Sequence, residues 1–134
     1  MLKDKYRLTK LPITHEFRRE KRLIQERGEI ALIVDGEIIK HITYFSLNPG
    51  DNWYRGGHYH KKKTENFYII SGKLKIILKD IDSGGKQELI LTAGDKVSIK
   101  PNCAHIFFAE EFSQVIEYYD SSYDPEDDFS YIDF

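Results

Sequence analysis

Three histidines and one glutamate have the spacing that points most directly to chemistry in this sequence. His58 and His60 stand two residues apart, and Glu65 follows five residues after the second histidine. On a β-strand, residues i and i+2 point to the same side of the sheet, so the two imidazoles are expected to project side by side. Imidazole nitrogens and carboxylate oxygens are ligands that zinc, iron, manganese and nickel accept. A second strand that brings His105 to the same place would complete a four-ligand metal site.

The spacing of these residues resembles the two sequence motifs of the cupin superfamily. The first motif is matched by His-x-His, four residues, Glu65, six residues and Gly72. The second motif is matched less closely, because six residues separate Gly94 from Pro101 and Cys103 stands where the motif has its second glycine. The resemblance implies an all-β, single-domain cupin jelly-roll barrel of the RmlC-like kind. It also implies that the four residues above hold one divalent metal ion, which is zinc, iron, manganese or nickel.

A narrower resemblance is carried by the residues around the paired histidines and near the C-terminus. Arg55-Gly56 precedes the histidines, Lys61-Lys62 follows them, and a Tyr-Asp-x-x-Tyr-Asp segment begins at Tyr119. This arrangement resembles small cupins that modify nucleotide sugars. Two groups share it: the dTDP-sugar 3,4-ketoisomerases and the C-terminal cupin domain of capsular polysaccharide enzymes of the CapF type. In the first group the paired histidines resemble metal-free acid/base groups, whereas in the second they hold a metal.

The resemblance implies an epimerase or isomerase that acts on a nucleotide-linked keto sugar in surface-polysaccharide biosynthesis. His58 and His60 are then the central catalytic residues, and Tyr44 is a proton donor near the cleft. Arg55 is expected to bind the phosphates of the substrate, because a planar guanidinium can hold a phosphate through two hydrogen bonds. The glutamate and the third histidine favour a metal-bound site, since proton transfer by two histidines does not require them.

Three alternatives remain open at this point. A metal-free sugar 3,4-ketoisomerase would use the paired histidines as acid and base, because an imidazole with a pKa of about 6.5 suits proton transfer at neutral pH. An Fe(II)-dependent dioxygenase uses the same set of three histidines and one glutamate, and it would consume oxygen. A non-catalytic cupin would bind a small ligand without turning it over.

Short strands separated by turn residues are expected to position the site. Residues 30–34 form an apolar run, and Asp35-Gly36 after them predicts a hairpin that leads into a return strand at 38–47. Residues 73–79 alternate between aliphatic side chains and lysine, as expected for a strand that is buried on one side. Gly72, just before them, is predicted to be a hairpin glycine. About nine or ten short strands without a convincing helix indicate a sandwich or barrel of the jelly-roll kind.

The pair Gly56-Gly57 lies between Arg55 and the first histidine of the motif. In a regular strand, residues 55 and 58 would point to opposite faces. Two glycines invite a β-bulge, which re-aims the side chains on either side of it. We therefore expect Arg55 to turn toward the histidine site.

Composition indicates a protein of one domain. The chain has 134 residues, which is enough to bury a core, and its 40% hydrophobic and 31% charged residues are ordinary for a globular protein. No window reaches the roughly 18 apolar residues of a membrane span, and the first residues lack an apolar signal core, so a cytoplasmic protein without membrane contact is expected. The single Cys103 fits a reducing compartment, and the net charge of −2 gives no reason to expect nucleic acid.

The two ends of the chain differ in charge. Residues 1–27 are interpreted as an N-terminal arm with nine basic and four acidic residues. Residues 118–134 form an acidic tail that also holds six aromatic side chains. A solvated tail has no need of so many aromatics, so the tail is expected to pack on the barrel or on a partner. A homodimer is the predicted assembly.

Overall fold

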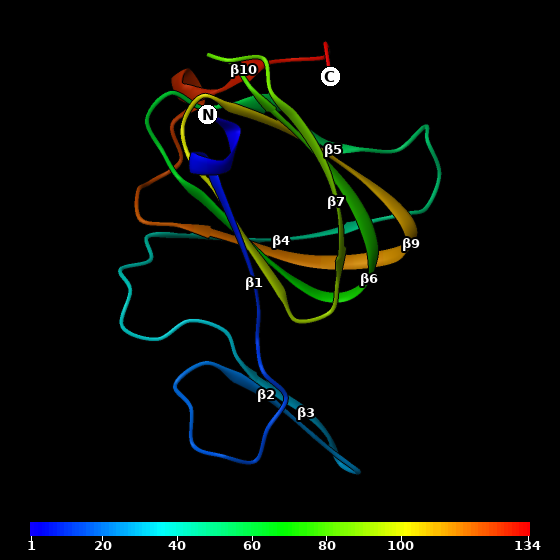
Figure 1. Ribbon diagram of the computed structural model, residues 1–134. Coiled ribbons are helices and arrows are strands. Elements are labelled where there is room, and N and C mark those ends of the chain that lie inside the picture. Colours follow the sequence, from blue (N-terminus) through cyan, green and yellow to red (C-terminus); the bar gives the residue numbers. More distant parts are fainter.

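Ten strands account for nearly all the regular structure of the computed structural model, which describes residues 1–134 (Figure 1). They are β1 (Tyr6–Lys10), β2 (Lys21–Gln25), β3 (Gly28–Leu32), β4 (His41–Leu47), β5 (Arg55–Tyr59), β6 (Glu65–Asp80), β7 (Lys86–Thr92), β8 (Asp95–Ile99), β9 (Cys103–Tyr119) and β10 (Phe129–Ser130). The helical part consists of two short 3-10 turns, η1 (Leu2–Asp4) and η2 (Pro125–Asp127). Neither has the length or the apolar character to cross a membrane.

Eight of the strands form one antiparallel sheet that curls around its own core (Figure 1). Its order is β1-β8-β6-β9-β5-β10, with β4 also pairing with β9 and β7 with β6. The other two strands, β2 and β3, form a separate hairpin that projects from the barrel. This is the all-β arrangement that the turn spacing predicts.

Two unusually long strands, β6 and β9, pair along most of their length and bend together. A hairpin was expected at Gly72, but this prediction is wrong, because β6 runs through that position without a break. Gly72 has a φ of +99°, and a Cβ atom there would lie 2.5 Å from the carbonyl oxygen of Phe112. The glycine therefore lets β6 bend while it stays in close contact with β9.

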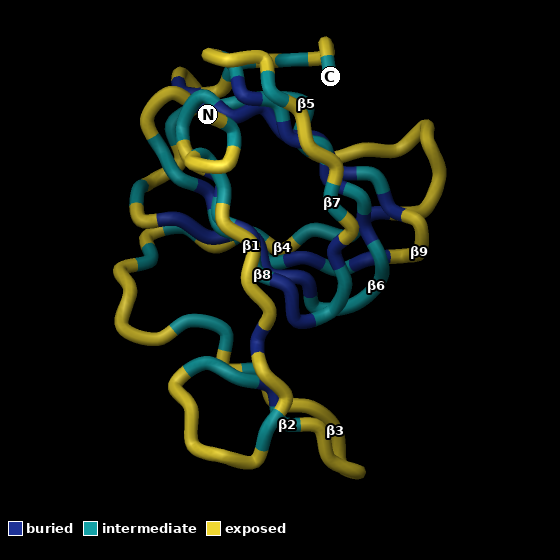
Figure 2. Tube along the Cα trace, viewed as in Figure 1, coloured by how far each residue is buried: buried dark blue, intermediate teal, exposed yellow.

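The predicted hairpin at Asp35-Gly36 is also absent. The first three residues of the preceding apolar run, 30–32, belong to β3, which pairs with the earlier strand β2 through a turn just before Gly28. The following strand, β4, pairs with β9 instead. A glycine is present both at the observed turn, Gly28, and at the predicted one, Gly36. The strand after Gly36 pairs with β9 and places Leu47 in the core, while the β2–β3 hairpin remains largely exposed (Figure 2).

The core lies between the faces of the curled sheet, and buried residues follow β6, β8 and β9 (Figure 2). Leu74, Ile76 and Leu78 are fully buried, which confirms the alternation expected at residues 73–79. Each such side chain stabilises the fold by roughly 1.5–3 kcal/mol. The rings of Phe67 and Phe107 extend this core to the end of the barrel where the histidines gather.

Candidate metal and active site

The four residues singled out by the sequence lie together at one end of the barrel. His58 is on β5, His60 directly follows that strand, Glu65 begins β6 and His105 is on β9. Because β5 pairs with β9, His58 lies opposite His105 in the register. One ligand atom from each of the four residues can be chosen so that all of these atoms are within 4.8 Å of one another.

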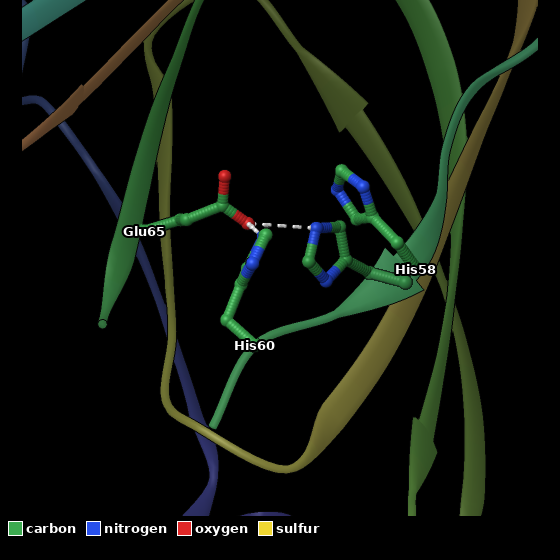
Figure 3. A group of neighbouring side chains, drawn as sticks. His58, His60 and Glu65 are labelled. Atoms are coloured by element: carbon green, nitrogen blue, oxygen red, sulfur yellow. Dashed lines mark ion pairs between the residues drawn. The ribbon is translucent and has the colours of Figure 1, made fainter. Parts of the chain in front are cut away.

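One oxygen of Glu65 is at the centre of the cluster. Its Oε1 atom lies 2.9 Å from Nε2 of His60 (Figure 3). The same atom lies 2.9 Å from Nε2 of His105. All three atoms are buried, and none of them has a hydrogen-bond partner of acceptable geometry. Buried polar atoms in native proteins are almost always satisfied, so three orphaned atoms facing one another indicate a missing partner.

The second nitrogen of each ring explains why these atoms are orphaned. Nδ1 of His60 is hydrogen-bonded to the backbone carbonyl of Asp127, and Nδ1 of His105 lies 3.1 Å from the carbonyl oxygen of Cys103. A carbonyl only accepts, so each Nδ1 carries a proton, and a ring without a second proton presents a lone pair at Nε2. In that form of both rings, two lone pairs face a carboxylate oxygen. A cation between them, either a proton or a metal ion, relieves this conflict, and the donor set fits a divalent metal.

The pKa values of these groups reflect their mutual contact. Burial alone would raise the pKa of Glu65, but the imidazoles of His105 and His60 hold it well below its usual range. Burial would lower the pKa of His60, yet the neighbouring Glu65 carboxylate raises it overall. Burial, with a further contribution from the charge of His105, lowers the pKa of His58 to about 4. The His58 ring is therefore neutral at pH 7.

A cavity of about 210 Å³ opens onto the cluster. Its walls include the site histidines His58 and His105, three phenylalanine rings, and the polar side chains of Thr43, Arg55 and Glu117. The cavity is thus apolar on most of its surface with a few polar groups directed at one end, which is the usual composition of a small-molecule site.

Arg55 reaches this cavity because of the predicted bulge. The β5–β9 register shifts between Gly56 and His58, and both glycines of the pair have positive φ angles, +83° and +75°. A Cβ atom on Gly56 would lie 2.7 Å from the carbonyl oxygen of His105, so a larger residue does not fit there. The guanidinium of Arg55 donates from Nε and Nη2 to the carbonyl of Ser46, at 3.3 and 3.2 Å, and keeps its other N–H groups available.

The structure does not bring Tyr44 to the cluster. Its neighbours Thr43 and Phe45 line the cavity, and alternation along β4 sends Tyr44 to the outer face of the sheet. Tyr44 is 54% exposed there, and its hydroxyl accepts a hydrogen bond from Gln114 at 2.9 Å. This geometry does not support the expected role of Tyr44 as a proton donor in the cavity.

Three acidic residues near the site were missed by sequence reasoning. Glu117 lines the cavity, and burial together with its contact to Glu65 raises its pKa to about 9. Its position in the sequence could have indicated this, because Glu117 alternates with Val115 and Tyr119 and therefore shares their inward face of the strand. Asp127 and Asp128 of the tail approach the histidines themselves, and no local pattern distinguishes them from the other acids of the tail.

Comparison with solved structures supports the fold. A sugar 3,4-ketoisomerase from Thermoanaerobacterium thermosaccharolyticum, in complex with TDP, has 22% sequence identity and a TM-score of 0.73, and the match covers 93% of this chain and 87% of that one. The dTDP-4-dehydrorhamnose 3,5-epimerase of Sulfolobus tokodaii has 21% identity and a TM-score of 0.71, with 85% and 77% of the chains covered. The predicted cupin jelly roll is therefore confirmed.

Comparison of sequences identifies the family. A segment of 57 residues is 40% identical to the UDP-2-acetamido-2,6-beta-L-arabino-hexul-4-ose reductase of Pseudomonas aeruginosa. The segment is 42% of this chain and only 14% of that relative, so the match covers a small part of the larger protein. Residues 24–127 match the family described as the polysaccharide biosynthesis C-terminal domain, and since this match spans most of the chain, the protein belongs to that family.

Proposed function

We propose that the chain is a metal-binding sugar-nucleotide isomerase or epimerase of surface-polysaccharide biosynthesis. The single observation that carries the metal site is the group of three orphaned atoms, Oε1 of Glu65 and Nε2 of His60 and His105. His58, whose ring centroid lies 4.9 Å from that of His105, supplies the fourth ligand. Three nitrogens and one oxygen suit zinc, iron, manganese or nickel better than magnesium or calcium.

The reaction class is supported by the family and by the names of the similar structures. The family description refers to polysaccharide biosynthesis, and the similar folds include a sugar 3,4-ketoisomerase and a 3,5-epimerase. The cavity of about 210 Å³ is smaller than the roughly 300–1,000 Å³ of sites that enclose a drug-sized ligand. It is thus suited to the sugar ring alone, with the nucleotide outside and its diphosphate near Arg55.

The residues of the cavity have separable roles in this proposal. The bound metal would polarise the substrate carbonyl, which acidifies the neighbouring C–H group. Arg55, already oriented by Ser46, orients the substrate through its diphosphate. The phenylalanine rings exclude water from the reacting end, and Thr43 and Glu117 offer hydrogen bonds to sugar hydroxyls.

Elemental analysis tests the metal site. Protein purified without a tag or chelator is expected to contain about one divalent metal per chain, and His58→Ala is expected to lose most of it. Glu88→Gln is the control, because Glu88 is exposed on β7, a strand that carries none of the four proposed ligands. A well-folded wild-type protein without metal would contradict the proposed site. Iron accompanied by oxygen consumption would favour the dioxygenase instead.

The reaction is tested by proton exchange. Wild-type protein incubated in D₂O with a dTDP-linked 4-keto sugar is expected to replace the hydrogen next to the carbonyl by deuterium, as followed by NMR. Arg55→Ala should raise KM more than it lowers kcat, because Arg55 contacts the diphosphate and not the reacting atoms. Absence of exchange with dTDP- and UDP-linked keto sugars would contradict the isomerase proposal while leaving the metal site intact.

A metal-free 3,4-ketoisomerase is the second candidate, and the structural similarity favours it. The ketoisomerase fold covers 93% of this chain. Under this alternative a proton, and not a metal, lies between Glu65 and the imidazoles, and His58 and His60 move protons directly. Deuterium exchange that persists in chelator-treated protein with no bound metal would support it over the metal-bound enzyme.

We also propose that two copies of the chain associate. Ile42 is 66% exposed on the outer face of β4, and a groove of about 290 Å³ between the β2–β3 hairpin and the sheet is lined by Ala31, Ile33 and other apolar residues. No ion pair joins the basic residues 1–27 to the acidic residues 120–134 within one chain. Five of the nine basic residues are paired with other acids, so the attraction of a second copy falls to the remaining four, which are Lys3, Arg7, Lys21 and Arg27. Sedimentation equilibrium should show a dimer that Ile42→Asp weakens. A monomer at every concentration would contradict it.

A further inference from the structure

Two of the three site histidines contact the C-terminal tail through the ring nitrogen Nδ1. Nδ1 of His58 lies 3.0 Å from Oδ1 of Asp128, and Nδ1 of His60 is hydrogen-bonded to the carbonyl oxygen of Asp127. The third histidine, His105, uses a carbonyl of its own strand. The tail therefore contributes directly to the surroundings of the cluster, although its own side chains are not in the ligand set.

The tail is held against the histidine strand by several independent contacts. Strand β10 pairs with β5, so that Ser130 lies opposite His58, and the amide of Tyr131 donates to the carbonyl of Gly57 at 2.8 Å. The ring of Phe129 stacks on Tyr59 with centroids 5.4 Å apart. These contacts fix residues 127–131 beside the site. We refer to residues 124–131 as the tail clasp.

Asp127 anchors the clasp at its inner end. Its side chain is only 4% exposed, and its two carboxylate oxygens accept hydrogen bonds from the backbone amides of Lys61, Lys62 and Lys63 at 2.7–3.3 Å. Three successive amides that converge on one carboxylate form a small anion-binding nest. This places the backbone carbonyl of Asp127 within reach of His60, and it places the next residue, Asp128, within reach of His58.

The contact between Asp128 and His58 has a consequence for metal binding. An acceptor at Nδ1 holds the proton on that nitrogen, so the lone pair of the ring is at Nε2, and it limits rotation of the ring. The side chain of His58 is about one-quarter exposed, so packing restrains it less than it restrains the buried His60 and His105. His58 is thus the ligand that most needs a partner to orient it.

We propose that Asp128 is a positioning residue that orients His58 for metal binding, and that the tail clasp is a structural part of the metal site. This inference rests on the proposed metal site. Partners of this kind typically change metal affinity by about 10- to 100-fold when they are removed. The affinity for Zn²⁺, measured by competition with a chelating dye, is therefore the informative quantity.

Two substitutions at Asp128 and one control separate positioning from charge. Asp128→Ala removes the acceptor, and we expect Zn²⁺ to bind about 10- to 100-fold more weakly with unchanged stoichiometry. Asp128→Asn removes the charge but keeps an oxygen that accepts from Nδ1, so we expect it to recover most of the lost affinity. Glu126→Gln removes one charge from the same clasp without any side-chain contact to a histidine, and its affinity should stay within about twofold of wild type.

Each result then has a definite meaning. Equal affinities of Asp128→Ala and Glu126→Gln would overturn the inference and leave the metal site standing. An Asn variant as weak as the Ala variant would show that the charge of Asp128 acts at a distance, which also overturns a positioning role. Wild-type protein that binds no Zn²⁺ would remove the proposed metal site itself. Urea unfolding in the presence of EDTA verifies that the Ala and Asn variants fold with the same stability.

Discussion

Two buried carboxylates at different places in the barrel have opposite surroundings. Asp80, at the end of β6, is 1% exposed, and Glu65, at the beginning of the same strand, is 2% exposed. Asp80 is saturated with donors: Nζ of Lys5 at 2.6 Å, Oγ of Ser83 at 2.7 Å and the amide of Asp82 at 3.0 Å. Glu65, in contrast, directs one oxygen at two imidazole nitrogens that offer it no hydrogen bond.

The difference is the one expected between a structural acid and the metal ligand proposed at Glu65. The donors around Asp80 connect β1 and the turn after β6, so its charge helps to hold the N-terminal segment on the barrel. Glu65 is held less firmly, because the two imidazoles facing its Oε1 are acceptors in their neutral form, and its Oε2 has only a long ion pair of 3.9 Å with Lys63. A folded chain retains such a conflict where an external cation can resolve it. Substitutions at the two acids should therefore have opposite effects on stability and on metal binding.

Replacing the carboxylate of Glu65 should produce the largest change. Glu65→Gln removes the central ligand, and we expect the affinity for Zn²⁺ to fall by about 1,000-fold or more, equivalent to about 4 kcal/mol. The stability of the metal-free protein should change little, because the Gln amide can donate to the two imidazole nitrogens. Lys63, which lies 3.9 Å from Oε2 of Glu65, loses that ion pair but keeps its contact with the ring of Tyr119. Dye competition and urea unfolding in EDTA measure the two quantities. A metal-free variant as unstable as an Asp80 variant would make Glu65 a structural acid as well.

Removal of Asp80 should affect stability alone. Asp80→Ala leaves Ser83 and the amide of Asp82 without their acceptor and weakens the hold on Lys5, so we expect the free energy of unfolding to fall by about 3 kcal/mol. The metal content should remain unchanged. The control is Asp82→Ala, since Asp82 also pairs with Lys5 but is 68% exposed, and its loss should cost less than about 1 kcal/mol. Similar losses for the two variants would contradict a special role for the buried acid.

The pH dependence of stability should separate wild-type protein from Asp80→Ala by a smaller amount. Burial alone would raise the pKa of Asp80, but hydrogen bonds from Lys5 and Ser83 hold it far below its usual range. The unfolded carboxyl binds a proton near pH 3.9, so the stabilisation is complete above about pH 5 and is lost progressively as the pH falls through 3.9 toward the lower pKa of the folded state. Wild-type protein in EDTA should lose stability more steeply than Asp80→Ala between pH 6 and pH 3. Parallel curves would mean that other carboxyls dominate acid unfolding.

The sequence predicted that His58, His60, Glu65 and His105 lie together because most of this geometry is local. The spacing of His58, His60 and Glu65 depends on one strand and the turn after it, and two glycines were enough to predict the bulge that turns Arg55 inward. The resemblance of the segment that begins at Gly94 to the second cupin motif then indicated His105 as the third histidine. These features can be predicted from the sequence because they depend on the alternation of side chains along a strand and on local backbone conformation, and not on packing between distant segments.

The errors arose where distant contacts decide the outcome. Gly72 and Gly36 both have positive φ angles, as expected of turn glycines, yet neither makes a hairpin, because pairing with β9 governs both β6 and β4. The tail was expected to pack on a sheet, and it does, but its register on β5 cannot be read from local sequence. Asp128 meets His58 only through that register, so its position near the site was not predictable.

The smallest expected effect is at Tyr44, which tests whether the inner and outer faces of β4 are as different as the structure shows. Tyr44→Phe removes only the exposed hydrogen bond from Gln114, so stability should change by no more than about 0.5 kcal/mol and metal content should be unchanged. If proton exchange on the keto sugar also stays at the wild-type rate, the reaction is confined to the inner face. Thr43→Val, one residue away on the cavity wall, is the matched comparison and should raise KM. A loss of exchange in Tyr44→Phe with normal metal content would place the proton donor on the outer face, and the cavity beside His58 would then not be the complete active site.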